Sequence, residues 1–217
     1  MFSKSRGALV LATYLAVLST AGCTSISQTV TQLISDPVQT NVLSGREGEN
    51  GPVLVVKIDD TRYARPQIGL EFADVVYIEQ VEGGLTRLAA VFSSTIPPRI
   101  GPVRSARISD IEILAQYGKV GFAYSGAQQK LTAVINASNL FNMSAEKFGY
   151  WEPYFRDNSR YAPVNLYINP NTLLEKAHAK DIYFEKVQPT FLAESITVPL
   201  LTSLAISVWA FRIIANG

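Results

Sequence analysis

The sequence predicts a mixed α/β (α+β) fold, in which a central mixed β-sheet carries a Gly-Gly hairpin and short helices flank the sheet. Three observations indicate this fold class. An apolar run over 53–58 is rich in β-branched residues, as a buried strand is. Two further β-rich segments, 74–82 and 85–93, lie on either side of Gly83-Gly84. Apolar residues make up 47% of the chain and charged residues 17%, which favours a folded core over disorder.

The glycine pair predicts a two-residue hairpin turn, because glycine adopts positive φ without strain. A turn centred on this pair places Glu79 opposite Leu88 and Gln80 opposite Arg87. In that register Arg87 shares a face with Glu82, and Glu79 points to the other face of the sheet.

Shorter patterns predict the elements that follow the hairpin. We expect a helix over 109–117, a strand over 120–124, a helix over 127–137, a strand over 165–168 and a helix over 171–179. Between 139 and 164 the chain is aromatic and irregular. Its rings either stack on sugars or fill the core beneath a loop.

Residues 1–22 have the pattern of a secretory signal, with basic residues followed by an apolar stretch and then small residues. Cys23, the one cysteine of the chain, follows Thr-Ala-Gly, which is similar to a bacterial lipobox with threonine in place of the usual leucine. The similarity implies cleavage before Cys23 and a diacylglycerol on its sulfur. The alternative is a plain signal peptide with an incidental cysteine. We expect a lipid-anchored protein on the extracytoplasmic face of a cell membrane, with 23–51 as a flexible tether.

The charge balance and the motif content exclude several classes of function. The formal net charge is +1, and removal of a signal containing Lys4 and Arg6 leaves 17 basic and 18 acidic residues, or −1. Nucleic-acid-binding proteins usually carry a strong basic excess. His178 is the one histidine, so a zinc site is not expected. The sequence contains no Walker A or GxGxxG run, and we expect no cofactor.

The end of the chain allows two interpretations. Residues 196–214 are almost entirely apolar, with Arg212 the one charged residue. The run has about the length that a membrane-spanning helix needs. Its β-branched segments also have the pattern of strands, which would belong to an incomplete C-terminal domain over 191–217.

Five motifs occur in a specific order: Val-Leu-Val-Val-Lys-Ile-Asp-Asp (53–60), Ala-Arg-Pro-Gln-Ile-Gly-Leu (64–70), Ala-Asp-Val-Val-Tyr-Ile-Glu (73–79), Val-Glu-Gly-Gly-Leu-Thr-Arg (81–87) and Arg-Ile-Gly-Pro-Val-Arg-Ser-Ala-Arg (99–107). This pattern resembles the YerB-like bacterial lipoproteins, a family of unknown function. The resemblance implies a lipid anchor, a globular domain over 52–190 and, in typical members, a second C-terminal domain. The chain departs from the pattern after Phe191, and it has Val164 where members often have a histidine.

The segment 96–110 carries the strongest chemical signal of the sequence. Three arginines stand within nine positions, among prolines and a glycine: Arg99, Arg104 and Arg107. Ser109 and Glu112 have the spacing of a capping box, which predicts a helix start with free N–H groups. Guanidinium groups beside such a start would bind phosphate, sulfate or carboxylate. The candidate ligand-binding residues are Arg65, Arg99, Arg104, Ser105 and Arg107, with Arg87 nearby.

Two other interpretations of these charges stay open. In the first, the arginines pair with Asp59, Asp60, Glu79 and Glu82 and only hold loops to the sheet. In the second, Asp59 with Glu79 or Glu82 acts as general acid and base in a hydrolase of wall glycan or phosphodiester. Nucleophilic catalysis by Ser105 or Ser125 has little support, because neither stands in a Gly-x-Ser-x-Gly motif.

The sequence therefore predicts a lipid-anchored envelope protein that binds an anionic or glycan ligand, or a partner protein, through an arginine-lined cleft. The first alternative is the hydrolase. The second is an inactive fragment, since the second domain of the family is incomplete. Whether the protein is an enzyme is not decided by the sequence.

Overall fold

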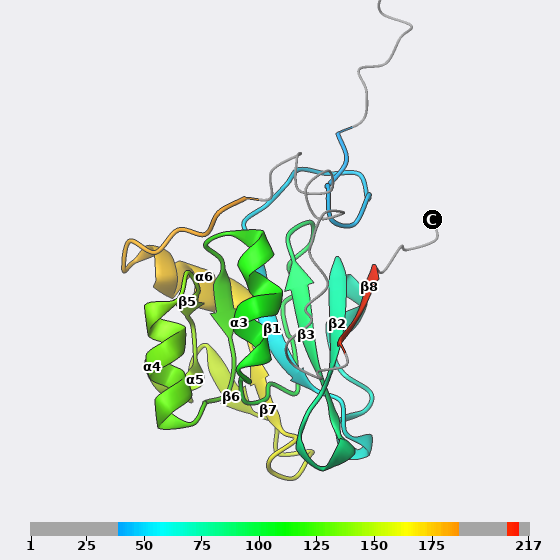
Figure 1. Cartoon of the computed structure of the whole chain (residues 1–217), viewed down its shortest axis with the longest axis vertical. Helices are drawn as coiled ribbons and strands as arrows, with labels where there is room; N and C mark the ends of the chain where they lie inside the picture. Colours follow the sequence, from blue (N-terminus) through cyan, green and yellow to red (C-terminus); the bar gives the residue numbers. More distant parts are fainter. Residues whose placement is uncertain (1–38, 187–207, 213–217) are drawn as a thin grey trace, which may run out of the picture. The chain divides into compact units, whose positions relative to one another are not determined.

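In a computed structural model of the chain, the described residues are 39–186 and 208–212. Within them, the larger sheet has the strand order β5-β4-β1-β3-β2-β8, and a separate pair is formed by β6 and β7 (Figure 1). The bounds of the strands are β1 (Leu54–Asp59), β2 (Val75–Gln80), β3 (Thr86–Phe92), β4 (Gly121–Ala123), β5 (Phe141–Asn142), β6 (Tyr154–Arg156), β7 (Leu166–Ile168) and β8 (Val208–Arg212). The described α-helices are α3 (Ser109–Leu114), α4 (Gln129–Ala137), α5 (Ala145–Phe148) and α6 (Pro170–His178).

The larger sheet is mixed, as the sequence predicts. Strand β1 runs parallel to β4, and β4 runs parallel to β5. The pairs β1–β3, β2–β3 and β2–β8 are antiparallel. The predicted fold class is therefore confirmed.

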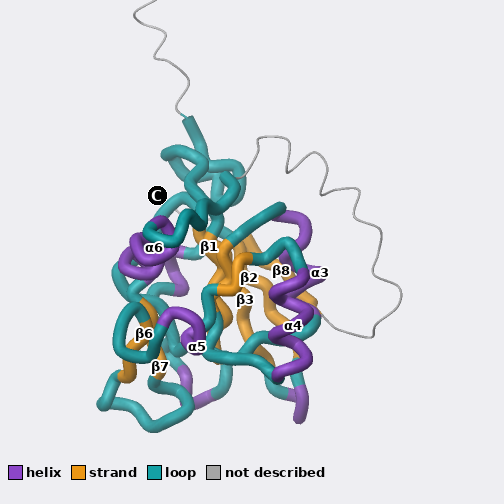
Figure 2. The backbone as a smooth tube through the Cα atoms, turned by 90° about the vertical axis from the view of Figure 1, so that its left-hand side faces the viewer, coloured by secondary structure: helices purple, strands orange, loops and turns teal. Residues whose placement is uncertain are grey.

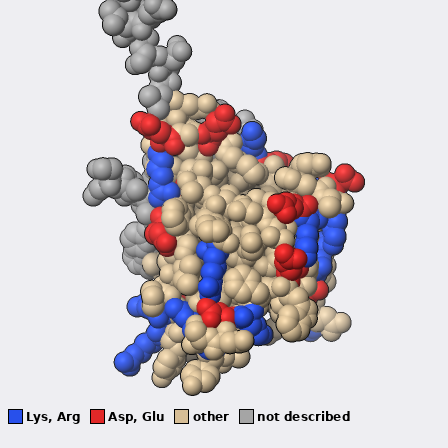
Figure 3. Space-filling view, turned by 180° about the vertical axis from the view of Figure 1, so that it is seen from behind, with Lys and Arg blue, Asp and Glu red and all other residues tan. Residues whose placement is uncertain are grey.

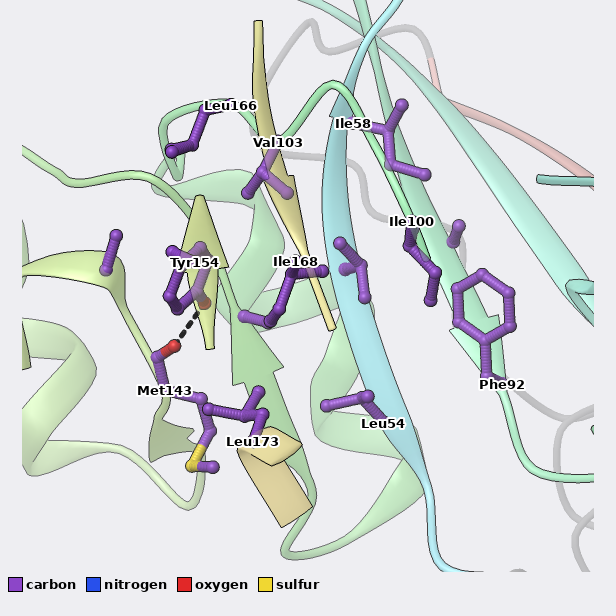
Figure 4. Packing of buried hydrophobic residues seen from close by; sticks show 14 of the residues in the cluster. Leu54, Ile58, Phe92, Ile100, Val103, Met143, Tyr154, Leu166, Ile168 and Leu173 are labelled. Atoms are coloured by element: carbon purple, nitrogen blue, oxygen red, sulfur yellow. Dashed lines mark hydrogen bonds between the residues drawn. The ribbon is translucent and has the colours of Figure 1, made fainter. Parts of the chain in front are cut away.

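Elements cover both faces of the central strands, so β1 is buried along its whole length (Figures 1 and 2). Leu54, Val56 and Ile58 pack against the β6–β7 pair and α6 on one face. Figure 4 shows this layer, in which the Tyr154 hydroxyl donates a hydrogen bond to the Met143 carbonyl. The other residues of β1 face α3 and α4. Because side chains alternate along a strand, this second face also receives Lys57 and Asp59.

The hairpin has a different register from the predicted one. The Val81 N–H donates to the Leu85 carbonyl at 2.8 Å, so the loop contains three residues rather than two. Glu79 consequently pairs with Arg87 instead of Leu88. Both loop glycines have positive φ, at 73° and 71°, so glycine is favoured at each, but the pair alone does not set the loop length. A one-residue shift moves every side chain of one strand to the other face. Glu79 and Arg87 therefore share a face.

Helix α3 begins where the sequence predicts, but it has no capping box. The Ser109 hydroxyl donates to Glu79 Oε2 at 2.6 Å rather than binding the first helical turn. The Asp110 carboxylate instead accepts the Arg107 N–H at 2.7 Å. The predicted capping box is therefore wrong, and a carboxylate of the helix accepts the N–H of Arg107, which lies just before the N-cap residue.

The packed domain begins earlier than the predicted tether allows. Asn41 and Leu43 are buried, although both fall within the segment 23–51. The Asn41 side chain accepts from the Leu43 N–H at 3.0 Å and donates to Ser93 Oγ at 3.2 Å. These contacts hold residues after 39 against the sheet. The predicted signal, Cys23 and the first part of the tether lie outside the described residues.

Part of the C-terminal apolar run is a strand of the same sheet. Strand β8 lies antiparallel to β2, with Val76 opposite Phe211. No helix of the part of the chain that the structure describes is long and apolar enough to cross a bilayer. The rest of the run lies outside the described residues.

Candidate anion-binding site

The arginine segment lies where two parallel strands separate. Beyond their short pairing, β1 and β4 diverge, and the segment 100–106 inserts between their carboxyl ends. The Arg104 N–H donates to the Lys57 carbonyl at 2.8 Å, and the Ser125 N–H donates to the Arg104 carbonyl at 2.9 Å. Crevices at the carboxyl ends of parallel strands are common ligand sites in α/β proteins. The main chain therefore fixes where Arg104 and its neighbours stand.

A pocket with a volume of about 550 Å³ opens beside this segment, and we call it the arginine pocket. Its charged lining residues are Arg104, Arg107, Arg156 and Glu146. The hydroxyls of Ser105 and Ser125 also line it and lie 3.4 Å apart. The lining therefore combines three guanidinium groups with a single carboxylate, and it has hydroxyl donors between them.

The three arginines differ in how their charge is compensated. Arg104 Nε lies 2.6 Å from the buried Asp59 carboxylate. Arg107 Nη2 lies 2.8 Å from the exposed Glu82 carboxylate. Arg156 donates to the amide oxygen of Asn165 at 2.7 Å, and none of the described carboxylates forms an ion pair with it. Arg156 thus brings the least compensated positive charge to the pocket.

A fourth guanidinium group, that of Arg87, adds positive charge next to the segment without lining the pocket. Arg87 is half-buried and donates to the Ser105 carbonyl at 3.0 Å. Its burial, together with the nearby charges of Arg107 and Arg104, lowers the pKa of Arg87 to about 10, although two carboxylates oppose this. The group stays protonated at neutral pH, so the segment is surrounded by a net positive cluster.

Two of the predicted binding residues lie elsewhere. Arg65 is exposed and pairs with Asp60 at 2.9 Å. Arg99 pairs with Asp157, and its guanidinium lies over the Tyr167 ring, 3.9 Å from the centroid. Neither residue lines the arginine pocket, so both serve to hold loops. The predicted pairing with sheet and loop carboxylates holds for Arg65 with Asp60, Arg104 with Asp59 and Arg107 with Glu82, whereas Arg99 has a partner that was not predicted. Arg104, Ser105 and Arg107 also meet at one pocket.

The predicted catalytic carboxylates do not face one another across this pocket. Glu79 is fully buried, where one oxygen is bonded by Lys57 Nζ and the other by the Ser109 hydroxyl. Arg87 stands between Asp59 and Glu79 on one rung of the sheet. Glu82 is 72% exposed at its side chain and paired with Arg107. This arrangement offers no support for an acid–base pair in a hydrolase.

Lys57, Glu79 and Asp110 form a buried charged triad. Lys57 Nζ donates to Glu79 and, at 2.7 Å, to Asp110 Oδ1. Burial alone would raise the pKa of Glu79, but the Lys57 charge and hydrogen bonds in the triad bring it below its usual value. Burial raises the pKa of Asp110 to about 7, with Lys57 opposing and Glu79 reinforcing the shift. The triad is therefore neutral on the acidic side of pH 7 and carries one negative charge above it.

The comparisons with known proteins match this domain. Residues 40–183 match the model of the family described as "Protein of unknown function (DUF3048) N-terminal domain". The chain belongs to this family. The match covers most of the residues that the structure describes. It confirms the family that the five sequence motifs resemble.

A curated sequence and a solved structure, both named YerB and both from Bacillus subtilis, match this chain. The curated protein named "Putative lipoprotein YerB", from strain 168, is 49% identical over 59 residues, which is 27% of this chain and 18% of that protein. The crystal structure of the YerB protein matches with a TM-score of 0.60 at 25% identity, covering 69% of this chain and 53% of the crystallised one. The structural match thus spans about half of the crystallised YerB chain, and the aligned sequence segment spans less than a fifth of the curated YerB sequence.

The aromatic stretch of this DUF3048 domain is divided between the core and the surface. Phe148 and Tyr154 are buried in the core. Tyr150 lines the arginine pocket and donates to the Ser125 carbonyl at 3.2 Å. Trp151 and Tyr161 are almost fully exposed.

Several important residues of the DUF3048 domain escape sequence reasoning. Arg156 reaches the pocket from β6, and nothing in its local sequence distinguishes it from other surface arginines. Lys57 did leave a signal, since it interrupts an otherwise apolar strand and a buried lysine requires acidic partners. Asp110 has the pattern of a helix-start residue, and only the tertiary structure shows its contact with Lys57.

Proposed function

We propose that the protein is a lipid-anchored extracytoplasmic protein whose DUF3048 domain binds an anionic envelope ligand in the arginine pocket. One observation carries the proposal: Arg104, Arg107 and Arg156 converge on a single pocket that has one carboxylate in its lining. A pocket of about 550 Å³ is within the usual size range for small-ligand sites.

The chemistry of the lining suits phosphate or carboxylate oxygens. Guanidinium groups present paired N–H donors that match such oxygens, and the Ser105 and Ser125 hydroxyls add short-range donors. Among the residues that line the pocket, none is a histidine or cysteine that could activate or act as a nucleophile. The lining therefore favours binding over bond cleavage.

The binding proposal is tested with Arg156→Gln, because Arg156 has no buried carboxylate partner whose loss would confound the result. We expect its affinity for inorganic pyrophosphate, measured by isothermal titration calorimetry, to fall about tenfold, since one charge-assisted hydrogen-bonding group is lost.

The matched control for this test is Arg65→Gln, an exposed arginine outside the pocket. The control should bind pyrophosphate as the unaltered protein does. Equal losses of pyrophosphate affinity in the two variants would indicate a general charge effect. An unchanged affinity in Arg156→Gln would show that pyrophosphate does not bind in the arginine pocket.

The anchoring part of the proposal is supported by the name of the curated relative, which describes that protein as a lipoprotein. It is also supported by the small residues before Cys23. We expect Cys23→Ala to move the protein from the membrane fraction to the soluble fraction after cell fractionation, because no acyl chain can then be attached.

Thr24→Ala, next to the acylated position, is the control for processing in general and should remain in the membrane fraction. If Cys23→Ala also stays with the membrane, acylation at Cys23 is not what holds the protein there.

A further inference from the structure

We propose that the ligand is an elongated anionic polysaccharide that lies along three contiguous pockets, with sugar rings resting on two exposed tyrosines. The inference rests on the proposed function, since the arginine pocket is the middle subsite. It adds the class of ligand and the two flanking subsites.

The three pockets adjoin one another through shared lining residues, and we call the set the groove. A pocket of about 710 Å³ shares Arg104, Ala162 and Pro163 with the arginine pocket, and we call it the tyrosine subsite. A third pocket, of about 300 Å³, shares Arg107 and Gln128 with the arginine pocket. A ligand bound only in the arginine pocket would leave both neighbours empty. The adjacency of the three pockets therefore favours a chain-like ligand.

Positive charge is present in every part of this groove. Arg62 and Arg160 line the tyrosine subsite together with Asp59, and Lys130 lines the third pocket together with Glu82. Figure 3 shows basic side chains gathered toward the lower end of the rear face, the end at which Figure 1 draws the loop between β6 and β7. Charges distributed along a groove match a ligand with negative groups at intervals, rather than one with a single charged end.

Two tyrosines stand at the tyrosine subsite with little contact to the protein. Tyr63 is 80% exposed and Tyr161 is 90% exposed, and both line this subsite. Their loops are fastened together, because Arg160 donates to the Ala64 carbonyl at 2.8 Å and to the Pro66 carbonyl at 2.9 Å. The rings therefore stand on fixed backbone although the core does not need them. Such rings offer an apolar face and a polar hydroxyl, which suits the alternating C–H and O–H surfaces of sugars.

A polysaccharide fits these features better than a nucleic acid does. Single-stranded nucleic acids also use basic grooves with aromatic platforms. The chain without its predicted signal has a formal charge of −1, however, and proteins that bind nucleic acids usually carry a basic excess. The extracytoplasmic location proposed above also favours an envelope polymer.

The test uses calorimetry on the purified protein with two series of ligands of increasing length. Hyaluronan oligosaccharides from disaccharide to decasaccharide carry carboxylates, and mannose oligosaccharides joined by phosphodiesters carry phosphates. We expect affinity to rise at least about tenfold with length in one series and then to level off when the groove is filled. The series that shows this rise identifies the anionic group. Neutral dextran oligosaccharides should not bind.

The tyrosines provide the second part of the test. Tyr63→Ala and Tyr161→Ala should each lower the affinity for the longest oligosaccharide about fivefold and leave pyrophosphate binding unchanged. Tyr183→Ala, an exposed tyrosine outside the groove, should change neither affinity.

The outcomes separate the two proposals. If pyrophosphate binds and depends on Arg156, but affinity does not grow with length or ignores both tyrosines, the polysaccharide inference is wrong and the pocket remains. Tighter binding of a single-stranded oligonucleotide, with the same dependence on the tyrosines, would replace the polysaccharide with a nucleic acid. If pyrophosphate binding does not depend on Arg156, the arginine pocket is not the binding site and both proposals are wrong.

Discussion

Lys57→Met is expected to lower the free energy of unfolding by about 3–5 kcal/mol, because it leaves Glu79 as an uncompensated charge in the core. Lys57 and Glu79 are both fully buried, and Lys57 Nζ is the cation that contacts Glu79 and Asp110. Methionine has nearly the same length and fills the same space, so the effect of charge is separated from that of a cavity. Urea unfolding followed by circular dichroism measures the change.

A double variant shows whether the charge is the cause. Adding Glu79→Gln to Lys57→Met removes the unpaired carboxylate, so it should recover part of the lost stability, and the cycle gives a coupling energy. Lys130→Met on the exposed face of α4 is the matched control and should change stability by less than about 0.5 kcal/mol. A Lys57→Met protein as stable as the control would show that the triad contributes nothing to the fold.

Asp110→Asn is expected to abolish a decrease in stability that the unaltered protein shows as the pH rises. The pKa of Asp110 is about 7 in the folded state and has a reference value of 3.8. Between these values the folded protein holds a proton that the unfolded chain has released. The stabilisation linked to this proton is fully present below about pH 4 and is lost as the pH rises through 7. Its total is on the order of 4 kcal/mol, or about 1.4 kcal/mol per pH unit at most.

The measurement compares the free energy of unfolding at pH 5, 6, 7 and 8. Asparagine resembles the protonated carboxyl, so the variant should have a flatter profile than the unaltered protein and exceed its stability at pH 8. The lowered pKa of Glu79 affects stability only as the pH falls below that group's usual range, which lies under this window. Glu112→Gln, on the exposed side of α3, is the control and should keep the original slope. The same slope in Asp110→Asn would assign the pH dependence to another group.

The fold was predictable from the sequence to the extent that motifs and local patterns determine it. The five motifs identified the family, and most strands and helices lie within a few residues of their predicted positions. The register of the hairpin was not predictable, because Gly83-Gly84 allows loops of two or three residues. That one-residue difference decides whether Glu79 lies opposite the buried Leu88 or opposite Arg87, on the face that carries Lys57.

The site was predictable only in part. Arg104, Ser105 and Arg107 are neighbours in sequence on an extended segment, so the density of arginines was a sufficient signal for them. Arg99 has the same signal but points to Tyr167 and Asp157, which local sequence cannot show. Arg156 joins the pocket through the β6–β7 pair, and its proximity is a result of tertiary structure alone.

The manner in which the segment 100–106 is held has a consequence for how recognition can diversify. Its position depends on main-chain amides and carbonyls, which most residue types provide. Gly101 is an exception, because a Cβ there would lie 2.7 Å from the Tyr167 ring. Pocket side chains of this segment without a buried ionic partner, such as Ser105, can therefore be exchanged while the crevice between β1 and β4 keeps its shape, whereas Arg104 is tied to the buried Asp59 carboxylate. Homologues that share this scaffold can therefore differ in ligand preference at such positions without a change of fold.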